Sequence, residues 1–546
     1  MPSKKENVIR ELTANITKII SETNGISLDD TLELAGHSLL IKESPTIHKL
    51  IVQFRYLLAR YQQDELDIDT LMVHPVAHAI YKFFERFPLR FQEEHIHLTG
   101  SLSAEFIYPR LKKLLEGPKK KVVEQKIIEV YGEEALPIKS VEDVDRLIRL
   151  QEDEHFDRYL EILLLPKLIL TSKQAHKEAA YSMAETLYRN YNVGRVRLKF
   201  SFSRASAKEA DAIPGIEKLT SEDVVMGLYE GFTEFQKKNK DFDFILSPSF
   251  RKESHFYNPK THKDKKSAFE DQVEEIFALL KKYPQLKEKM NNVDTVGNER
   301  DLYRKSHFEH MRVGLRRLQF RGFKIRSHHG ETWHTLKKGV QAVDNAMNIW
   351  HIDTLEHGLS LGINPNFYFH MMFERVMAAN LEGRSIKKKT SDYDEIMDMD
   401  WMDYTEVRNK LIKGTKLTQD EIKIFIKIKF FTAREIEHYQ HDVLNRMIHK
   451  DVSLIALPSS NQKLTYFFPD FKDHPFSWWE KKGVSLGVGT DNYITLSTDF
   501  IKEMLILLFL DSQNLKITKL LMVVTGETRR PYISHLLWEM RQEYDE

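Results

Sequence analysis

From about residue 91 the chain repeats one pattern, in which a short apolar run of strand character is followed by a helical stretch. The eight runs of this kind are 93–100, 195–203, 241–249, 293–299, 323–331, 352–358, 452–460 and 484–492. Helical patterns separate most of them, for example at 221–235 and 267–283. Eight strands that alternate with helices are typical of the α/β class and of a (β/α)8 barrel. The alternation therefore predicts a TIM-type barrel.

Two parts of the chain exceed what a simple barrel needs. Residues 1–90 carry apolar residues at helical spacing and predict a helical N-terminal extension. The barrel would then cover residues 91–546, with a long insertion between its first two strands and a helical insertion at about 364–450. Within the second insertion, Thr418 and Glu421 have the spacing of a helix capping box.

Composition limits the chemistry that this chain can perform. It has no cysteine, which excludes disulfides, thiolate metal sites and cysteine nucleophiles. Its 81 basic and 81 acidic residues leave no net charge that would attract nucleic acid or an anionic membrane. The apolar runs at 162–170 and 504–510 are too short to cross a bilayer, and the first residues lack the apolar core of a signal peptide. We therefore expect a cytoplasmic protein with neither a membrane nor a nucleic-acid partner.

Residue types that bind metals fall at the ends of the strand-like runs, where barrel enzymes place their chemistry. His95 and His97 are two residues apart on the first run, so both imidazoles point to the same face. His328 lies at the end of the fifth run and Asp491 at the end of the eighth. Three imidazoles and one carboxylate suit a divalent ion such as zinc, with one position open for water. The fourth run, 293–299, contains no lysine, so a carbamate bridge to a second metal has no source there.

Two further side chains could transfer protons beside this cluster. Glu331 follows His328 by three residues, in a turn that Gly330 permits. A carboxyl group near a metal can move a proton without binding the metal. His357 lies at the end of the sixth run, where an imidazole could orient a water molecule and accept its proton. We expect Glu331 and His357 to be the catalytic residues.

The order of these motifs resembles that of the adenosine deaminase family. HIHLTGSL, SHHGET, DTLEHG, LPSSN and GTDN are similar, in this order, to the family signatures H-x-H-x-[DE]-G, H-A-G-E, R-I-G-H-G, C-P-x-S-N and N-T-D-D. The scattered match covers about residues 93–500. The resemblance implies that the four metal-binding candidates hold zinc. It also implies that Glu331 protonates the purine nitrogen N1 and that His357 assists the attacking hydroxide.

The resemblance further indicates which residues would bind the substrate. VDTVGNE is similar to the family's D-x-A-G-D-E, so the backbone of Gly297 would meet purine N3. Asn492 stands where the family has an aspartate that binds purine N7, and an amide can donate the same hydrogen bond. Thr99 replaces the acidic residue that contacts the ribose 5′-hydroxyl, which removes a repulsion toward a 5′-phosphate. Glu356 and Thr354 depart from the glycine and arginine of R-I-G-H-G.

These residues predict a hydrolytic deaminase that acts at C6 of an adenine-type nucleoside or nucleotide, with one zinc ion per chain. Other divalent metals would also fit the site. The partner would be a small purine, and adenosine, a nucleotide or an N6-substituted adenine all stay open because loops shape the pocket.

An assembly or sensor protein is the alternative function. Such a protein would keep a deaminase-like metal site with slow or no turnover. The size of the N-terminal extension and of the 364–450 insertion supports this alternative, because a homo-oligomer could form through either. Within the insertion, the run 391–404 is either a solvated loop or a subunit contact.

Overall fold

The computed structural model places all of its β-strands in one sheet. It describes residues 4–38, 44–151, 154, 156–202, 213–465, 467 and 470–545. Within these residues the strands are β1 (Phe91–His97), β2 (Val193–Ser201), β3 (Asp243–Arg251), β4 (Asn292–Val296), β5 (Lys324–His329), β6 (Thr354–His357), β7 (Ser453–Ala456) and β8 (Leu486–Val488). They follow one another in the sheet in the order of the chain, and every neighbouring pair is parallel.

The sheet closes between its first and last strands. Ile96 of β1 forms a parallel bridge with Asp491, which follows β8. The backbone amide of His97 donates to the carbonyl of Asp491 at 2.7 Å, and the amide of Asp491 donates to the carbonyl of His95 at 2.8 Å. Eight parallel strands with intervening helices form a (β/α)8 barrel. The predicted fold is confirmed.

Every predicted strand-like run overlaps a strand, but several runs extend beyond the carboxyl end of their strand. The run 484–492 contains only Leu486–Val488, and the run 452–460 contains only Ser453–Ala456. After β7 the chain enters helix α22 (Pro458–Thr465) instead of continuing the sheet. The sequence predicts longer strands because the residues beyond the strand ends are buried at the mouth of the barrel and continue the strand-like pattern. Residue 203, the last of the run 195–203, lies outside the described residues.

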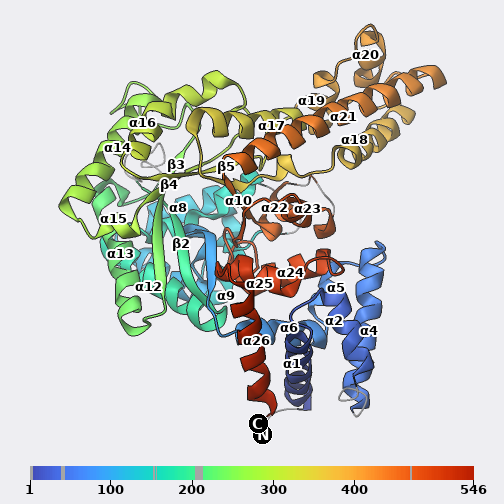
Figure 1. The fold of residues 1–546 in the computed structure, drawn as a ribbon. Coiled ribbons are helices and arrows are strands. Elements are labelled where there is room, and N and C mark those ends of the chain that lie inside the picture. The colour runs from blue at the N-terminus through green and yellow to red at the C-terminus, as the bar shows by residue number, and fades with distance from the viewer. Residues whose placement is uncertain are drawn as a thin grey trace.

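Helices surround the barrel and cover the outer faces of its strands (Figure 1). Helix α23 (Phe476–Lys481) precedes β8. The helices that follow β2, β3, β4, β5 and β8 include α13 (Ser221–Lys238), α14 (Lys265–Lys282), α15 (Leu286–Lys289), α16 (Glu309–Phe320), α17 (Leu336–Asn345) and α24 (Phe500–Leu510). In α24 every residue except Lys502 is buried, so the most apolar run of the sequence is a core helix. Among the described residues, no helix has both the length and the apolar character that a bilayer span requires.

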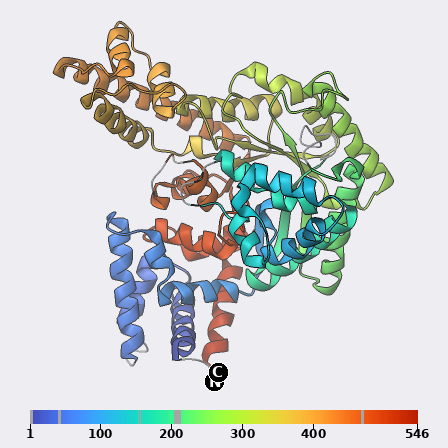
Figure 2. The ribbon, with the colours of Figure 1, turned by 180° about the vertical axis from the view of Figure 1, so that it is seen from behind.

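The N-terminal and C-terminal helices lie together on one side of the molecule (Figures 1 and 2). An ion pair of 3.1 Å joins Glu22 to Arg541, and the side-chain amide of Gln62 donates to the carbonyl of Phe509 at 2.7 Å. The N-terminal extension is helical in the described residues, as the spacing predicts. Its division from the barrel at residue 90, as a domain, stays a prediction. These helices are α1 (Lys4–Glu22), α2 (Leu28–His37), α4 (Pro45–Gln62), α5 (Ile68–Met72), α6 (Pro75–Glu85), α25 (Ile517–Thr525) and α26 (Arg530–Asp545).

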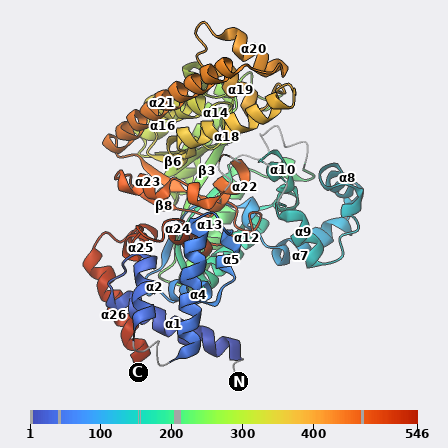
Figure 3. The ribbon, with the colours of Figure 1, turned by 90° about the vertical axis from the view of Figure 1, so that its right-hand side faces the viewer.

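The insertion between β6 and β7 forms a helical arm that projects from the barrel (Figures 1 and 3). Its helices are α18 (Pro365–Leu381), α19 (Ser391–Asp398), α20 (Thr405–Lys413) and α21 (Gln419–His449). The start of α21 confirms the predicted capping box, in which Thr418 and Glu421 each accept a hydrogen bond from the other's backbone amide. At the far end of α21, the side chain of Gln440 donates to the carbonyls of Ser360 and Ile363, which anchors the arm to the barrel.

The insertion between β1 and β2 is also helical. It comprises α7 (Ala104–Leu115), α8 (Lys120–Tyr131), α9 (Val141–Ile148), α10 (Phe156–Ile162), α11 (Leu164–Ile169) and α12 (Lys173–Asn190). Helices α7, α8 and α9 form a lobe at the side of the barrel (Figure 3). Helices α10 and α11 supply one wall of the pocket at the mouth of the barrel.

Candidate metal centre

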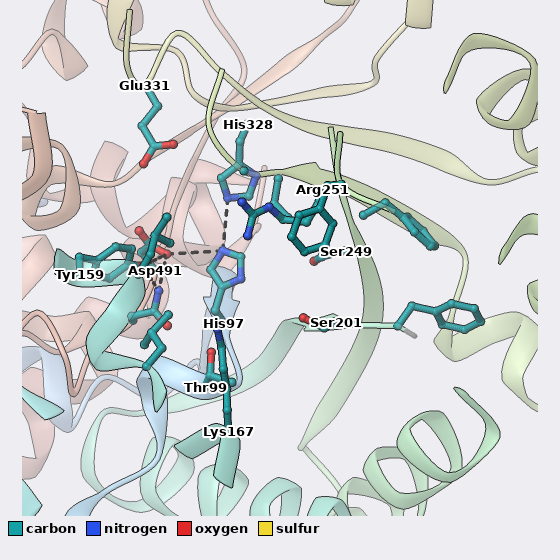
Figure 4. Close-up of a pocket in the computed structure, with 18 of the residues that line it drawn as sticks. His97, Thr99, Tyr159, Lys167, Ser201, Ser249, Arg251, His328, Glu331 and Asp491 are labelled. Atoms are coloured by element: carbon teal, nitrogen blue, oxygen red, sulfur yellow. Dashed lines mark hydrogen bonds and ion pairs between the residues drawn. The ribbon is translucent and has the colours of Figure 1, made fainter. Parts of the chain in front are cut away.

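The predicted metal-binding side chains meet at the carboxyl ends of the strands. His95 and His97 belong to β1 and His328 to β5, whereas Asp491 lies three residues beyond β8. The ligand atoms of His95, His97 and Asp491 lie within 4.8 Å of one another, and so do those of His95, His328 and His357. Figure 4 shows His97 between His328 and Asp491. The topology thus brings residues almost 400 positions apart in the sequence into one cluster.

The ring nitrogens in this cluster lie within hydrogen-bonding distance of one another. The Nε2 atom of His97 lies 3.2 Å from the Nε2 atoms of both His95 and His328. The Nδ1 atom of His95 is 2.7 Å from a carboxylate oxygen of Glu356, and that of His328 is 3.2 Å from Asp294. A neutral imidazole that donates from Nδ1 has a lone pair at Nε2.

The Nε2 lone pairs of His95 and His328 both point toward Nε2 of His97, where a cation would be stabilised. Asp491 supplies negative charge to the same point, with its Oδ1 atom 3.5 Å from Nε2 of His97. Its second oxygen accepts a hydrogen bond of 2.6 Å from the hydroxyl of Ser460, which orients the carboxylate. Nitrogen and carboxylate donors of this kind suit zinc and related divalent ions. The residues present therefore fit a single divalent metal.

A buried network of charges holds two of these histidines from behind. The ammonium group of Lys199 lies 2.8 Å from Glu356 and 2.7 Å from Asp294, and all three side chains are fully buried. Arg326 donates a further hydrogen bond to Glu356. A carboxylate that accepts the Nδ1 proton of a metal-binding histidine sets both the tautomer and the ring orientation. Lys199 thus connects the carboxylates behind His95 and His328.

The two predicted proton-transfer residues lie next to each other beside the cluster. Nε2 of His357 is 3.6 Å from Oε1 of Glu331, and it has no hydrogen-bond partner among the described residues. Nδ1 of His357 pairs with the amide oxygen of Asn461 at 2.9 Å. This contact makes Nδ1 the donor and leaves Nε2 able to accept a proton. His357 also lies close enough to His95 and His328 to share a metal ion with them, but its predicted role is catalytic.

Burial shifts the protonation of the groups around the centre. Burial lowers the pKa of His97 to about 3 and holds the pKa of His328 well below its usual value. Both imidazoles are therefore neutral at physiological pH, which metal binding requires. Burial raises the pKa of Glu331, against the opposing effect of His357. A carboxyl group with a raised pKa is suited to donate a proton.

The backbone is left-handed at two of these positions. His357 has a φ of +69° and Asp491 a φ of +63°, although neither is glycine. Such conformations are costly for residues with side chains and concentrate at functional sites. At both positions the chain leaves the strand direction and places a polar side chain over the mouth of the barrel.

No protein-family model matches the chain, and no curated protein matches it. Solved structures are similar to the chain. One is an adenine deaminase from Arthrobacter aurescens, at 14% identity and a TM-score of 0.47, over 84% of this chain and 100% of that one. Another is an amidohydrolase from Burkhoderia ambifaria with bound Zn, at 13% identity and a TM-score of 0.47, over 85% and 92%.

A third similar structure is an N6-methyl-AMP deaminase from Arabidopsis thaliana, at 12% identity and a TM-score of 0.46, over 85% of this chain and 98% of that one. The three are deaminases or amidohydrolases. At these identities the likeness concerns the fold, so what the site can do follows from its own residues.

The predicted substrate-binding residues line one pocket together with the cluster. Thr99, Gly297 and Asn492 share its wall with His97, His328 and Glu331. Gly297 has a φ of +102°, and a side chain there would collide with Glu253, whose Oε2 atom lies 2.3 Å from the position of a Cβ. This crowding explains why the fourth run needs a glycine.

Asn492 is already engaged within the protein. Its amide nitrogen donates to the hydroxyl of Tyr159 and to Oδ1 of Asp491, the latter at 2.9 Å. Its amide oxygen is buried without a hydrogen-bond partner among the described residues. The oxygen faces Gly100, where a Cβ would fall only 1.9 Å from it. The contact of Asn492 with a purine stays a prediction.

The sequence reasoning missed Lys199 and Tyr159, and it named Glu356 only as a departure from the family motif, without its role behind His95. Lys199 and Glu356 lie in strands and are fully buried, and Tyr159 comes from α10 in the first insertion. A lysine within the apolar run RVRLKFSFS was a signal that could have been used, because a buried lysine needs an acidic partner. No local pattern marks Tyr159, because only the tertiary structure carries α10 to Asp491.

Proposed function

We propose that this chain is a metal-dependent hydrolytic deaminase that acts at C6 of an adenine-type nucleoside or nucleotide. The observation that carries the proposal is the convergence of His95, His97, His328 and Asp491 beside Glu331 and His357 in one pocket. A metal cluster next to a carboxyl group with a raised pKa and an imidazole whose Nε2 has no hydrogen-bond partner among the described residues is the set of groups that hydrolysis of an amidine requires.

The three histidines and Asp491 would hold the metal, and zinc is the ion we propose. When bound, a divalent metal would lower the pKa of a water molecule toward neutrality. Glu356 and Asp294 would keep the Nε2 lone pairs of His95 and His328 directed at the metal.

Glu331 and His357 would divide the proton transfers between them. Glu331, whose pKa burial raises, would donate its proton to purine N1, which makes C6 more electrophilic. His357 would accept a proton from the attacking water at Nε2, because Asn461 already accepts the Nδ1 proton. The oxygen of the water thereby bonds to C6. His357 would return its proton to the exocyclic amine, so that the bond from C6 to this amine breaks and ammonia leaves, and the proton of the C6 hydroxyl would restore Glu331. The substrate and one water molecule become the 6-oxo product and ammonia.

Three residues would contact the substrate beyond its reacting carbon. The backbone of Gly297 would bind the purine ring, and Thr99 would lie toward the sugar. Asn492 would contact the ring after its amide nitrogen has given up its hydrogen bond to Tyr159 or Asp491. Phe156, Tyr159, Phe202, Phe250 and Phe256 line the same pocket and offer apolar surface to a base.

Ammonia release from the zinc-loaded protein tests the proposal. The panel is adenosine, deoxyadenosine, AMP, ATP and N6-methyladenosine, the last releasing methylamine instead of ammonia. We expect turnover of at least one member, lost after chelation and reduced in Glu331→Gln and His357→Ala. The matched control is His370→Ala, a histidine on the arm whose side chain is 54% exposed. Near wild-type turnover in Glu331→Gln would rule out the mechanism.

An assembly or sensor protein with slow turnover is the second candidate function. The projecting arm favours it, because Phe430 and Phe431 of α21 are about half exposed, at 51% and 49%. A stable multimer that binds one metal per chain but releases no amine from the whole panel would favour this function over the first.

A further inference from the structure

The pocket beside the metal centre has two chemically different parts. Of the two carboxylates that line it, Asp491 belongs to the cluster and Glu331 lies beside the cluster. The wall built by β3, α14 and the loop between them instead presents Arg251, His262 and Lys265. A ligand that fills the pocket would therefore meet carboxylates and metal-binding groups in one part and cationic groups in the other.

Lys265 is the most unusual of these cations. It is only 5% exposed, although lysine is almost never buried without an acidic partner. Its ammonium donates to the carbonyl of Phe256 at 3.3 Å. No ion pair of Lys265 occurs among the described residues. One long hydrogen bond satisfies a buried ammonium poorly, because the group has three protons to donate.

Arg251 adds a second cation to the same wall. Its guanidinium lies over the ring of Phe256, 4.4 Å from the centroid, and pairs with Glu253 at 2.5 Å. Glu253 also accepts a hydrogen bond of 2.9 Å from the backbone amide of Asn298. Burial, together with repulsion from Arg251, lowers the pKa of Lys265 to about 8, and Glu253 offsets this only in part. One carboxylate thus serves two cations, so an additional anion between them would be stabilised.

Further donors come from other walls of the same pocket. Lys167 of α11 lines it, as do the hydroxyl groups of Ser201 and Ser249. Figure 4 shows Lys167 beyond Thr99, on the side of His97 away from Glu331. Lysine, arginine and hydroxyl donors around one cavity are typical of phosphate recognition.

We propose that Lys265 and Arg251, with Lys167 from the opposite wall, bind a phosphate group of the substrate. The substrate would therefore be an adenine nucleotide and not a free nucleoside. This inference rests on the proposed function for the placement of the base at the metal centre. The phosphate would accept hydrogen bonds from Lys265 and Arg251 and would replace the missing carboxylate in their surroundings.

Calorimetric binding to the zinc-loaded Glu331→Gln protein tests this inference without interference from turnover. The ligands are AMP, adenosine and inorganic phosphate. We expect AMP to bind at least about tenfold more tightly than adenosine, as charge-assisted hydrogen bonds would require. Equal affinities for AMP and adenosine would overturn the inference. Inorganic phosphate that binds as tightly as AMP would assign the wall to free phosphate and also overturn it.

Two substitutions identify the responsible residues. Lys265→Gln should lower the ratio of AMP affinity to adenosine affinity by about tenfold, and Lys167→Gln should lower it in the same direction. Because Lys167 is only half-buried, its substitution still tests the inference if Lys265→Gln does not fold. The matched control is Lys266→Gln, an exposed neighbour on α14 that does not line the pocket. An unchanged ratio in folded Lys265→Gln and Lys167→Gln protein would contradict the inference.

The failure of this inference and that of the proposed function give different results. If adenosine and AMP are deaminated equally well and neither lysine matters, the deaminase stands and the phosphate site is wrong. If no compound releases an amine but AMP binding depends on Lys265, the phosphate site stands and the proposed reaction is wrong.

Discussion

Lys199 lies between two carboxylates that each hold one histidine of the metal cluster. Glu356 and Asp294 are fully buried on either side of it, and Arg326 adds positive charge next to Glu356. Although burial alone would raise the pKa of Glu356, Arg326 and Lys199 hold it well below its usual value. Glu356 is therefore an anion that accepts the Nδ1 proton of His95. The glycine found at this position in the similar family motif could not do so.

Replacing Glu356 tests this support directly. Glu356→Gln keeps the size of the side chain but removes the charge that balances Lys199 and Arg326. We expect the affinity for zinc to fall by about 10- to 100-fold, measured by competition with a chelator. The control is Glu406→Gln, an exposed glutamate of α20. Wild-type zinc affinity in folded Glu356→Gln protein would show that Glu356 does not orient His95.

The protonation of Lys265 predicts how nucleotide binding responds to pH. With a pKa of about 8, Lys265 is charged at lower pH and loses its charge as the pH rises through that value. Arg251 and Glu253 of the β3 wall face it, and His310 of α16 lies near enough to interact. We expect the affinity for AMP to fall as the pH rises above about 8. Calorimetry at several pH values measures this, and the trend should be weaker in Lys265→Gln. A flat profile for the wild type would contradict the prediction.

At the scale of elements, two strands end at or just before the polar residues of the candidate site. β6 ends at His357 and β8 ends before Asp491, and both residues have left-handed backbone. The first insertion then returns as α10 and α11, which bring Tyr159 and Lys167 to the pocket. The barrel thus provides the candidate metal cluster, and an inserted element provides the opposite wall.

The capping box of α21 gives a prediction at this scale. Thr418→Ala removes the hydroxyl that accepts from the backbone amide of Glu421, which costs about 1 kcal/mol at a helix start. We expect the amides of the first turn to exchange with solvent about fivefold faster, as measured by hydrogen–deuterium exchange. Glu421→Gln is the control, because glutamine can complete the box in the same way. Equal exchange in Thr418→Ala and wild type would show that the box does not stabilise α21.

At the scale of the whole molecule, the arm is the part that the barrel does not need. Among the described residues, seven of the fifteen large apolar side chains that are exposed belong to it. They are Leu381, Met397, Met402, Tyr404, Ile426, Phe430 and Phe431. Aromatic residues and methionine are enriched in protein interfaces. The lysines at 387–389 and the acidic run 391–404 give the arm both signs of charge, which suits contact with a second copy of itself.

We predict that the chain self-associates through this arm. Ile426 and Phe430 are four residues apart on α21 and share one face of the helix. Replacing both with aspartate should convert an oligomer into a monomer, as measured by light scattering. Tyr56→Asp on α4, where the side chain is 63% exposed, separates this interface from one made by the N-terminal helices. If only Tyr56→Asp dissociates the oligomer, the contact lies in the N-terminal helices. A monomeric wild type would contradict both alternatives.

The sequence by itself determined the barrel and the set of polar side chains that cluster at its mouth. Strands and helices follow from local periodicity, and the carboxyl ends of parallel strands must meet at one mouth. For that reason, the sequence predicts that residues as distant in the chain as His95 and Asp491 lie in one cluster. The capping box at Thr418 was also predictable, because it depends only on residues within one helical turn.

Only the tertiary structure decided which groups support the cluster and what surrounds the substrate. Lys199, Glu356 and Asp294 come from three strands, so their contacts depend on the register of the sheet and on burial, which no local pattern encodes. Lys265 is unusual because it is buried beside Arg251, whereas in the sequence it is one lysine among many. Long-range packing determines the charge balance around such a group, and the specificity of the pocket depends on that balance.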